Sequence, residues 1–286
     1  MILMTGCGRE LDLSQPRIMG ILNITPDSFS DGSRFNQLDR ALFHAEKMME
    51  EGAEIIDVGG ESTRPGAIYV SEQEELDRVV PVIEQLAKKL DVMISIDTYK
   101  PAVMAAACQA GAHLINDIKA LQEPGALKVA AESQALICLM HMQGEPQSMQ
   151  NHPVYKSVVD EVSHFLSNRV AACLAAGISP EKLILDPGFG FGKTLEQNYE
   201  LLGRLSEIQT GYPLLVGVSR KSMIGNLLNR SVDERLAGSI AAALYALAQG
   251  ARIIRVHHVQ ATSDAVKVFW RAQQYQTYHM NHICSG

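Results

Sequence analysis

The stretch that decides the fold is Ile18-Met19-Gly20-Ile21-Leu22-Asn23, a nearly continuous apolar run that stops at a polar side chain. Seven more runs of the same kind follow along the chain: Glu54 to Gly59, Met93 to Asp97, His113 to Asp117, Leu136 to His141, Leu183 to Asp186, Leu214 to Ser219 and Arg252 to His257. Short apolar runs of this kind are typical of parallel strands that are buried on both faces. The sequence therefore predicts eight buried strands.

Sequence with helical periodicity lies between nearly all of these runs, at 38–51, 71–89, 101–110, 124–133, 154–176, 195–208, 231–249 and 262–277. Eight strands alternating with eight helices predict an α/β fold, the closed (β/α)8 or TIM barrel, which typically takes about 250 residues. The whole chain, residues 1–286, is then one domain. Within residues 1 to 15 we expect a β-hairpin that caps the barrel floor.

The composition is that of an ordinary globular protein, with 47% hydrophobic and 20% charged residues. The formal net charge of −7, with no Lys/Arg-rich tract, argues against a nucleic-acid partner. No apolar run approaches the roughly 20 residues that a membrane span needs, and no secretory signal precedes the first strand, so we expect a cytoplasmic protein without a membrane partner. The five cysteines are odd in number and widely spaced, which favours reduced thiols.

Catalytic residues of such barrels come from the strand ends and the loops after them, which ring a single mouth. The candidates are therefore Asn23, Asp57, Asp97, Asn116, Asp186, Ser219, Arg255 and His257. Two of the following loops, Thr25 to Gln37 and Glu61 to Val70, are longer than a connection requires and are rich in Gly, Pro, Ser, Asp and Arg. Long irregular loops at this face are often functional.

Asp97, Asn116 and Asp186 would form an acceptor-rich wall at the mouth, suited to a flat heterocycle with several N–H donors. Metal ligation and helix capping would also explain such residues, since an Asp after a strand often caps the next helix. Capping is a serious rival explanation for Asp97. It is a weaker one for Asp186, because a glycine-rich loop intervenes before the next helix.

A basic corner is predicted beside this wall. Arg255 and His257 stand two apart on a strand and so share a face, and Lys221 follows the seventh strand. The loops after strands seven and eight are the usual phosphate site of these barrels. A solvated basic turn would explain Arg220 and Lys221 equally well, but not an arginine inside an apolar strand.

Two further residues extend this corner. Arg64, in a loop of glycines and hydroxyls, can chelate a phosphate with its planar guanidinium, although a solvated surface loop explains it equally well. Asn23 could offer its oxygen to a hard cation or its NH2 to a phosphate, and a capped turn would also explain it.

Taken together, these motifs resemble the dihydropteroate synthases over nearly the whole chain. The matching segments are Gly20 to Gly32, Asp57 to Gly66, Ser95 to Thr98, Asn116 to Ile118, Leu139 to Gly144, Asp186 to Lys193, Ser219 to Ser222 and Arg255 to His257. The resemblance implies condensation of 6-hydroxymethyl-7,8-dihydropterin pyrophosphate with p-aminobenzoate, giving 7,8-dihydropteroate and pyrophosphate for folate synthesis. It also implies Mg2+ as cofactor, sensitivity of the family to sulfonamides, and a homodimer.

The resemblance further implies a role for each matched residue. The residues of the pterin site would be Asp97, Asn116, Asp186 and Lys221. Those of the diphosphate site would be Asn23, Thr63, Arg64, Arg255 and His257, with Asn23 also contacting Mg2+. Those framing p-aminobenzoate would be Phe29, Pro65, Phe189 and Ser222. The catalytic residues would be Asp97, Asp186, Lys221, Arg255 and His257, acting mainly by electrostatic stabilisation of a pterin cation and of the departing diphosphate.

Two positions depart from the family pattern: Tyr99, where a small residue is usual, and His258, where Asp is common. Strand alternation predicts that His258 faces away from His257 and begins the turn into the last helix. Two other functions remain open, a pterin-binding methyltransferase domain and a catalytically silent paralogue that only binds pterin. A methyltransferase needs no diphosphate corner, so the basic residues argue against it.

Overall fold

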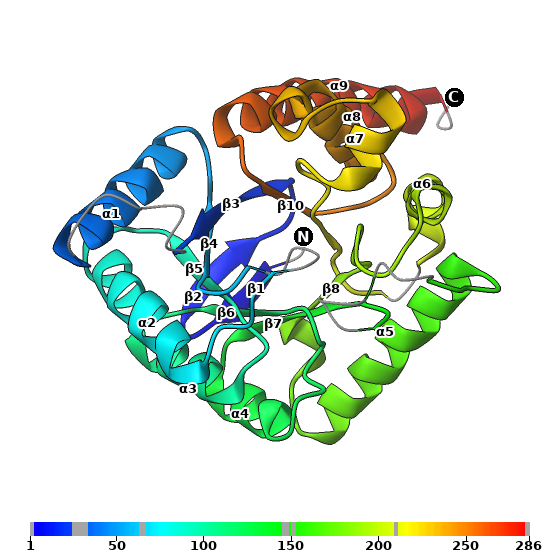
Figure 1. Cartoon of the computed structure of the whole chain (residues 1–286). Coiled ribbons are helices and arrows are strands. Elements are labelled where there is room, and N and C mark those ends of the chain that lie inside the picture. Colours follow the sequence, from blue (N-terminus) through cyan, green and yellow to red (C-terminus); the bar gives the residue numbers. More distant parts are fainter. Residues whose placement is uncertain are drawn as a thin grey trace.

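The computed structural model describes residues 3–24, 34–62, 67–144, 149, 153–208 and 211–283. Its centre is a ring of parallel strands with helices outside it (Figure 1). The strands are β3 (Arg17–Asn23), β4 (Ile55–Gly59), β5 (Met93–Asp97), β6 (Leu114–Asp117), β7 (Leu136–Met140), β8 (Leu183–Asp186), β9 (Leu215–Val216) and β10 (Ile253–Val256). They pair in the order β8-β7-β6-β5-β4-β3-β10-β9, and a parallel bridge from Leu185 to Leu214 joins the two ends of this row. The predicted barrel is confirmed.

The helices lie between the strands as the periodicity predicts. They are α1 (Arg34–Glu50), α2 (Glu72–Lys89), α3 (Pro101–Ala110), α4 (Ala126–Ser133), α5 (Val158–Ala175), α6 (Leu195–Gly203), α7 (Ser222–Leu228), α8 (Leu236–Ala248) and α9 (Val259–Ile283), with short 3-10 turns at Pro180–Lys182, Leu205–Glu207 and Val232–Glu234. Across the described ranges, no helix is both long enough and apolar enough to pass through a bilayer.

Some predicted bounds were wrong. Helix α7 was missed, since it has only seven residues and includes a glycine, and α1 begins inside the predicted first loop. The predicted start of α5 at 154 was four residues early. Val154 pairs both backbone groups with the Gln143 side chain, and Glu161 accepts the N–H groups of Lys156 and Ser157, so this backbone is bonded without a helix. The seventh strand is shorter than predicted.

A hairpin closes the floor of the barrel, as predicted. Strands β1 (Leu3–Gly6) and β2 (Arg9–Asp12) pair antiparallel. Met4, Leu11 and Leu13 pack against one buried residue from the start of each barrel strand: Met19, Ile55, Met93, Leu114, Leu136, Ile184, Leu215 and Ile253. Because side chains alternate along a strand, residues two and four positions further on point into the barrel above this layer. These inward positions supply the polar side chains at the mouth.

Candidate active site

Four strand ends stand at nearly one level around the mouth. In register, Asn23 pairs with Gly59, Gly59 with Asp97, and Asp97 with Asn116. A Cβ atom at Gly59 would lie 3.7 Å from Asn23 Oδ1 and 3.8 Å from Asp97 Oδ2. The glycine therefore leaves these two side chains facing each other across its backbone, and the predicted convergence of the strand ends is what the structure shows.

Arg255 lies in the middle of the acceptor wall. Its Nε donates to Asp57 Oδ2 and its Nη2 to Asp97 Oδ2, both at 2.6 Å, and Asn116 Nδ2 donates to the same Asp57 oxygen at 3.1 Å. The three ionised side chains are 20%, 0% and 7% exposed for Arg255, Asp57 and Asp97. The predicted acceptor wall and the predicted basic corner are thus joined through one guanidinium.

Asp57 is the residue that sequence reasoning left without a role. It lies two residues before Gly59 and two after Ile55, hence on the inward face, and it is fully buried. A buried carboxylate needs a charged or hydrogen-bonded partner, and Arg255 is the matching cation. The sequence does contain a pattern that indicates this ion pair, because Asp57 and Arg255 are opposite charges that each stand inside an apolar strand.

Two carboxylate oxygens of the acceptor wall have no hydrogen bond within the described part of the chain. Asp57 Oδ1 and Asp97 Oδ1 are buried and accept no hydrogen bond from the residues that the structure describes. Burial raises the pKa of Asp97 to about 7, against the lowering effect of Arg255 and with the help of neighbouring Asp57. Burial also raises the pKa of Asp186, although Lys221 lowers it. A ligand that brings N–H donors would supply the missing hydrogen bonds.

Asp186 and Lys221 form the opposite side of the mouth. Asp186 Oδ1 accepts the Gly188 N–H at 2.8 Å, and Lys221 Nζ donates to the carbonyl oxygen of Phe189 and lies 4.7 Å from the Phe191 ring centroid. Burial lowers the pKa of Lys221 to about 8, while Asp186 raises it. The Phe189 ring is fully buried in the apolar core, and Ser222, exposed, begins α7.

The two adjacent histidines have different partners, and His258 stands at the turn into the last helix, as predicted. His257 Nδ1 lies 3.1 Å from Ser219 Oγ, which also accepts the His257 backbone N–H at 3.2 Å. His258 immediately precedes α9, where its carbonyl accepts from Thr262, and its Nε2 accepts from Arg220 Nη2 at 2.6 Å. Burial and Arg220 lower the pKa of His258. Because Arg220 and Lys221 both have partners, the interpretation of these two residues as a solvated basic turn is wrong.

Helix capping is not the role of Asp97. Lys100 is the N-cap of α3, the helix that follows β5, so the capping hypothesis for Asp97 is wrong. A metal centre built from protein side chains finds no support either, because over the described ranges no three His, Cys, Asp or Glu side chains are grouped to hold an ion. Four of the predicted site residues, Phe29, Thr63, Arg64 and Pro65, lie outside the described residues.

Fold and site together define a (β/α)8-barrel enzyme with a cluster of buried polar side chains at the carboxyl ends of its strands. A sequence model of the family described as pterin binding enzyme matches residues 19–257. Dihydropteroate synthase of Haemophilus influenzae is 58% identical over 263 residues, covering 92% of this chain and 95% of that protein. Dihydropteroate synthase of Escherichia coli (strain K12) is 57% identical over 262 residues, covering 91% and 93%.

Solved structures agree. A Yersinia pestis dihydropteroate synthase with a sulfonamide drug complex superposes with a TM-score of 0.91 at 55% identity, covering 95% of this chain and 99% of that one. A Xanthomonas albilineans dihydropteroate synthase with 4-aminobenzoic acid gives 0.90 at 48% identity, covering 96% and 98%. The chain belongs to the pterin-binding enzyme family and, within it, to the dihydropteroate synthases, which are transferases. The predicted family, fold and function are confirmed.

Proposed function

We propose that this chain joins 6-hydroxymethyl-7,8-dihydropterin pyrophosphate to p-aminobenzoate and releases 7,8-dihydropteroate and pyrophosphate. The observation that carries the proposal is Arg255 bound between Asp57 and Asp97 at the mouth, beside Asn116. This arrangement offers acceptor oxygens to the donor edge of a pterin and a cation to its leaving group. The Yersinia pestis relative with a sulfonamide drug and the Xanthomonas albilineans relative with 4-aminobenzoic acid support a sulfonamide-sensitive arylamine site here.

The pterin would bind against Asp97, Asn116, Asp186 and Lys221. Asp97 Oδ1 has no hydrogen bond within the described part of the chain and is positioned to accept one. Asp186 is 5% exposed at the end of β8, where burial raises its pKa and the charge of Lys221 lowers it. A hydrogen bond to a charged group contributes about 1.5–3 kcal/mol, so each carboxylate has a measurable share in affinity.

The reaction begins with cleavage of the bond between the pterin methylene carbon and the diphosphate oxygen, and the electron pair leaves with the diphosphate. The arylamine nitrogen then attacks the methylene carbon and loses a proton. Asp97 and Asp186 stabilise the cationic pterin, while Arg255 and His257, together with Thr63 and Arg64, stabilise the anionic leaving group. The groups that frame p-aminobenzoate would be Phe29, Pro65 and Ser222, whereas Phe189, which the sequence placed with them, is fully buried in the apolar core and does not face a ligand.

Mg2+ fits this site through the substrate. The ion prefers oxygen ligands, keeps several waters and is usually bound by one or two protein groups plus phosphate oxygens. Asn23 supplies an amide oxygen at the mouth, and the described residues form no preformed cage of carboxylates and imidazoles. We propose that Asn23 is the protein ligand of a Mg2+ ion held mainly by the diphosphate. When bound, the ion would neutralise charge on the leaving group.

Pyrophosphate release tests the proposed reaction. The purified chain is mixed with the pterin pyrophosphate and Mg2+, with and without p-aminobenzoate. A synthase releases pyrophosphate together with dihydropteroate only when the arylamine is present. A methyltransferase domain or a silent paralogue gives neither product.

The pH dependence of pterin binding is expected to follow Asp97. Because burial raises the pKa of this carboxyl to about 7, it is protonated at lower pH and loses the negative charge that strengthens its hydrogen bond to the ligand. Affinity should therefore weaken as the pH falls below about 7, by about ten- to a hundredfold in all. Lys221, with its pKa lowered to about 8 by burial, loses its charge at higher pH, so kcat/KM should also fall there. Calorimetry with a non-reactive pterin measures the fall in affinity at low pH. In Asp97→Asn the affinity should not change over this pH range.

The two histidines are expected to respond differently to substitution. His257→Ala should raise the KM for the pterin pyrophosphate about tenfold, because a donor to the charged leaving group is lost. His258→Asp should leave turnover within about threefold, since a carboxylate can accept from Arg220 as the imidazole does. Steady-state kinetics on both variants measure this. An equal loss at His258 would place both imidazoles in the diphosphate site.

We also propose that the protein is a cytoplasmic homodimer. An apolar groove lies between α6, α7 and α8, and we propose that a second copy of the chain binds there. Leu227, Leu228 and Tyr245 line the groove and are 57%, 46% and 46% exposed. Continuous apolar surface of this kind is typical of subunit interfaces. Sedimentation of Leu227→Asp tests it, with Val268→Asp on α9, where the side chain is 73% exposed, as the control. A monomeric Leu227→Asp beside a dimeric control supports the interface.

A further inference from the structure

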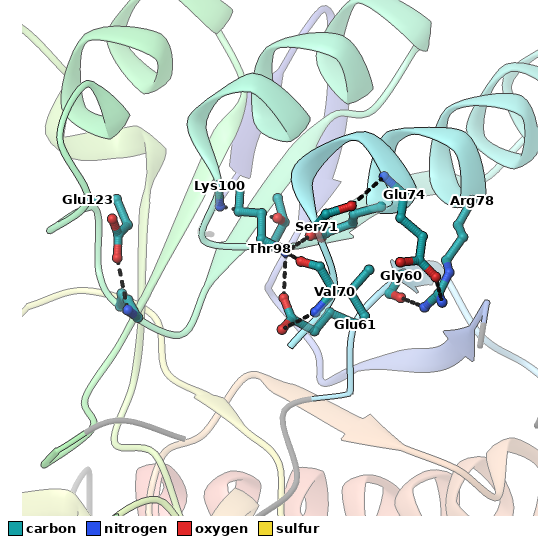
Figure 2. Close-up of polar contacts among 11 residues, drawn as sticks. Gly60, Glu61, Val70, Ser71, Glu74, Arg78, Thr98, Lys100 and Glu123 are labelled. Carbon is teal, nitrogen blue, oxygen red and sulfur yellow. Dashed lines mark hydrogen bonds and ion pairs between the residues drawn. The ribbon is translucent and has the colours of Figure 1, made fainter. Parts of the chain in front are cut away.

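The two ends of the loop from Glu61 to Val70 are joined by one glutamate and one lysine (Figure 2). Glu61 Oε1 accepts the Val70 backbone N–H at 3.2 Å, and its Oε2 accepts from Lys100 Nζ at 2.6 Å. The same ammonium donates to the Val70 carbonyl oxygen at 2.7 Å. Both backbone polar groups of Val70 are therefore bound by charged side chains at the base of the loop.

Lys100 is itself fixed by the elements around it. It precedes α3 as the N-cap residue, its backbone N–H donates to Thr98 Oγ1, and its third side-chain donor reaches Glu75 Oε2 on α2 at 2.5 Å. Lys100 and Glu75 are 5% and 1% exposed. Charge-assisted hydrogen bonds are shorter and stronger than neutral ones, so this cluster ties the loop to two helices.

A second contact holds the entry to the loop. Arg78, on α2, donates to the Gly60 carbonyl oxygen at 2.6 Å. A Cβ atom at Gly60 would lie only 2.8 Å from Val79 Cγ1 and 2.9 Å from Glu75 Cγ, so the backbone there lies directly against α2. The start of the loop is thus fixed before the chain reaches Glu61.

We propose that Glu61 and Lys100 are positioning residues for the reaction. They fix the two described ends of the loop, residues 61–62 and 67–70, between which Thr63, Arg64 and Pro65 stand in the sequence. The proposal rests on the proposed function, in which those three residues contact the substrates. Misplacement of a positioned group by about 1 Å can cost about a hundredfold in rate. Loss of the bonds that Glu61 and Lys100 make at the base of the loop should therefore slow the reaction.

Glu61→Ala is the most informative variant. It removes the bonds that the Glu61 carboxylate accepts from Val70 and Lys100 but leaves Lys100 paired with Glu75, so the buried ammonium keeps a partner. We expect the KM for p-aminobenzoate to rise about tenfold while the Kd of a non-reactive pterin stays within about twofold. Glu61→Gln, which retains an acceptor for the Val70 N–H, should lie between this variant and the wild type.

Glu123→Ala is the matched control. Glu123 also pairs with a lysine, Lys119, at 2.8 Å, but this pair lies in the loop after β6, and the Glu123 side chain is 33% exposed. We expect this variant to behave as the wild type. In the double variant Lys100→Met/Glu61→Ala, the KM for p-aminobenzoate should rise by the same factor as in Lys100→Met alone. Both residues act through the same set of bonds to Val70, so their effects are not additive.

Amide hydrogen exchange gives a readout that does not need turnover. Exchange at Val70 should be faster in Glu61→Ala than in Glu123→Ala. Unchanged exchange, an unchanged KM for p-aminobenzoate, or a pterin Kd that rises as much as that KM would each overturn the inference. A wild-type chain that releases no pyrophosphate would overturn the proposed function instead, and the exchange result would still decide whether the two residues hold the loop.

Discussion

Arg255→Met is expected to abolish measurable turnover and to lower the free energy of unfolding by about 3–5 kcal/mol. The guanidinium is the shared partner of Asp57 and Asp97, both buried, and each already has one oxygen without a hydrogen bond from the described chain. Removing it leaves two like charges together in a poorly solvated site. Urea denaturation followed by circular dichroism, with pyrophosphate release on the same samples, measures both effects.

Arg204→Met is the control for the loss of an arginine. Arg204 also makes two ion pairs, with Glu200 and Glu207, but at the surface, where such pairs contribute little. Adding Asp57→Asn to Arg255→Met should recover part of the lost stability without recovering turnover. A single Arg255→Met variant as stable as the wild type would contradict the view that this guanidinium neutralises the carboxylates.

Asp186→Asn is expected to weaken pterin binding about ten- to a hundredfold while changing p-aminobenzoate binding much less. The substitution removes a charged acceptor at the end of β8, yet its amide oxygen can still accept the Gly188 N–H and keep the loop in place. Calorimetry with a non-reactive pterin measures the loss. Unchanged affinity would remove Asp186 from the pterin site.

Asp117→Asn separates a ligand role from a structural one. Asp117 is also a fully buried strand-end carboxylate, but it accepts the backbone N–H groups of Lys119 and Leu121 at 2.7 Å. We expect this variant to lose stability, because its amide can replace only one of the two acceptors, and to retain pterin affinity once folded. If Asp186→Asn loses pterin affinity and Asp117→Asn does not, the loss comes from a contact between Asp186 and the pterin rather than from a general loss of stability.

The barrel follows from local sequence because a strand buried on both faces is mostly apolar and ends near the point where polar residues return. That rule placed Asn23, Asp97 and Asp186 at strand ends, and all three end their strands in the structure. Prediction from local sequence was wrong where the helix or strand is short. Helix α7 spans two turns with a glycine inside it, and β9 pairs over two residues only.

The sequence by itself determined the strand order along the chain, the family, and the level at which polar side chains enter the barrel, because period-two alternation and strand length are local properties. Which charges meet was decided only by the tertiary structure. Asp57 and Arg255 are 198 positions apart, and Glu61 and Lys100 are 39 apart. Folding excludes water from each pair, and burial leaves each of these charges bound to the opposite charge that the fold brings within reach.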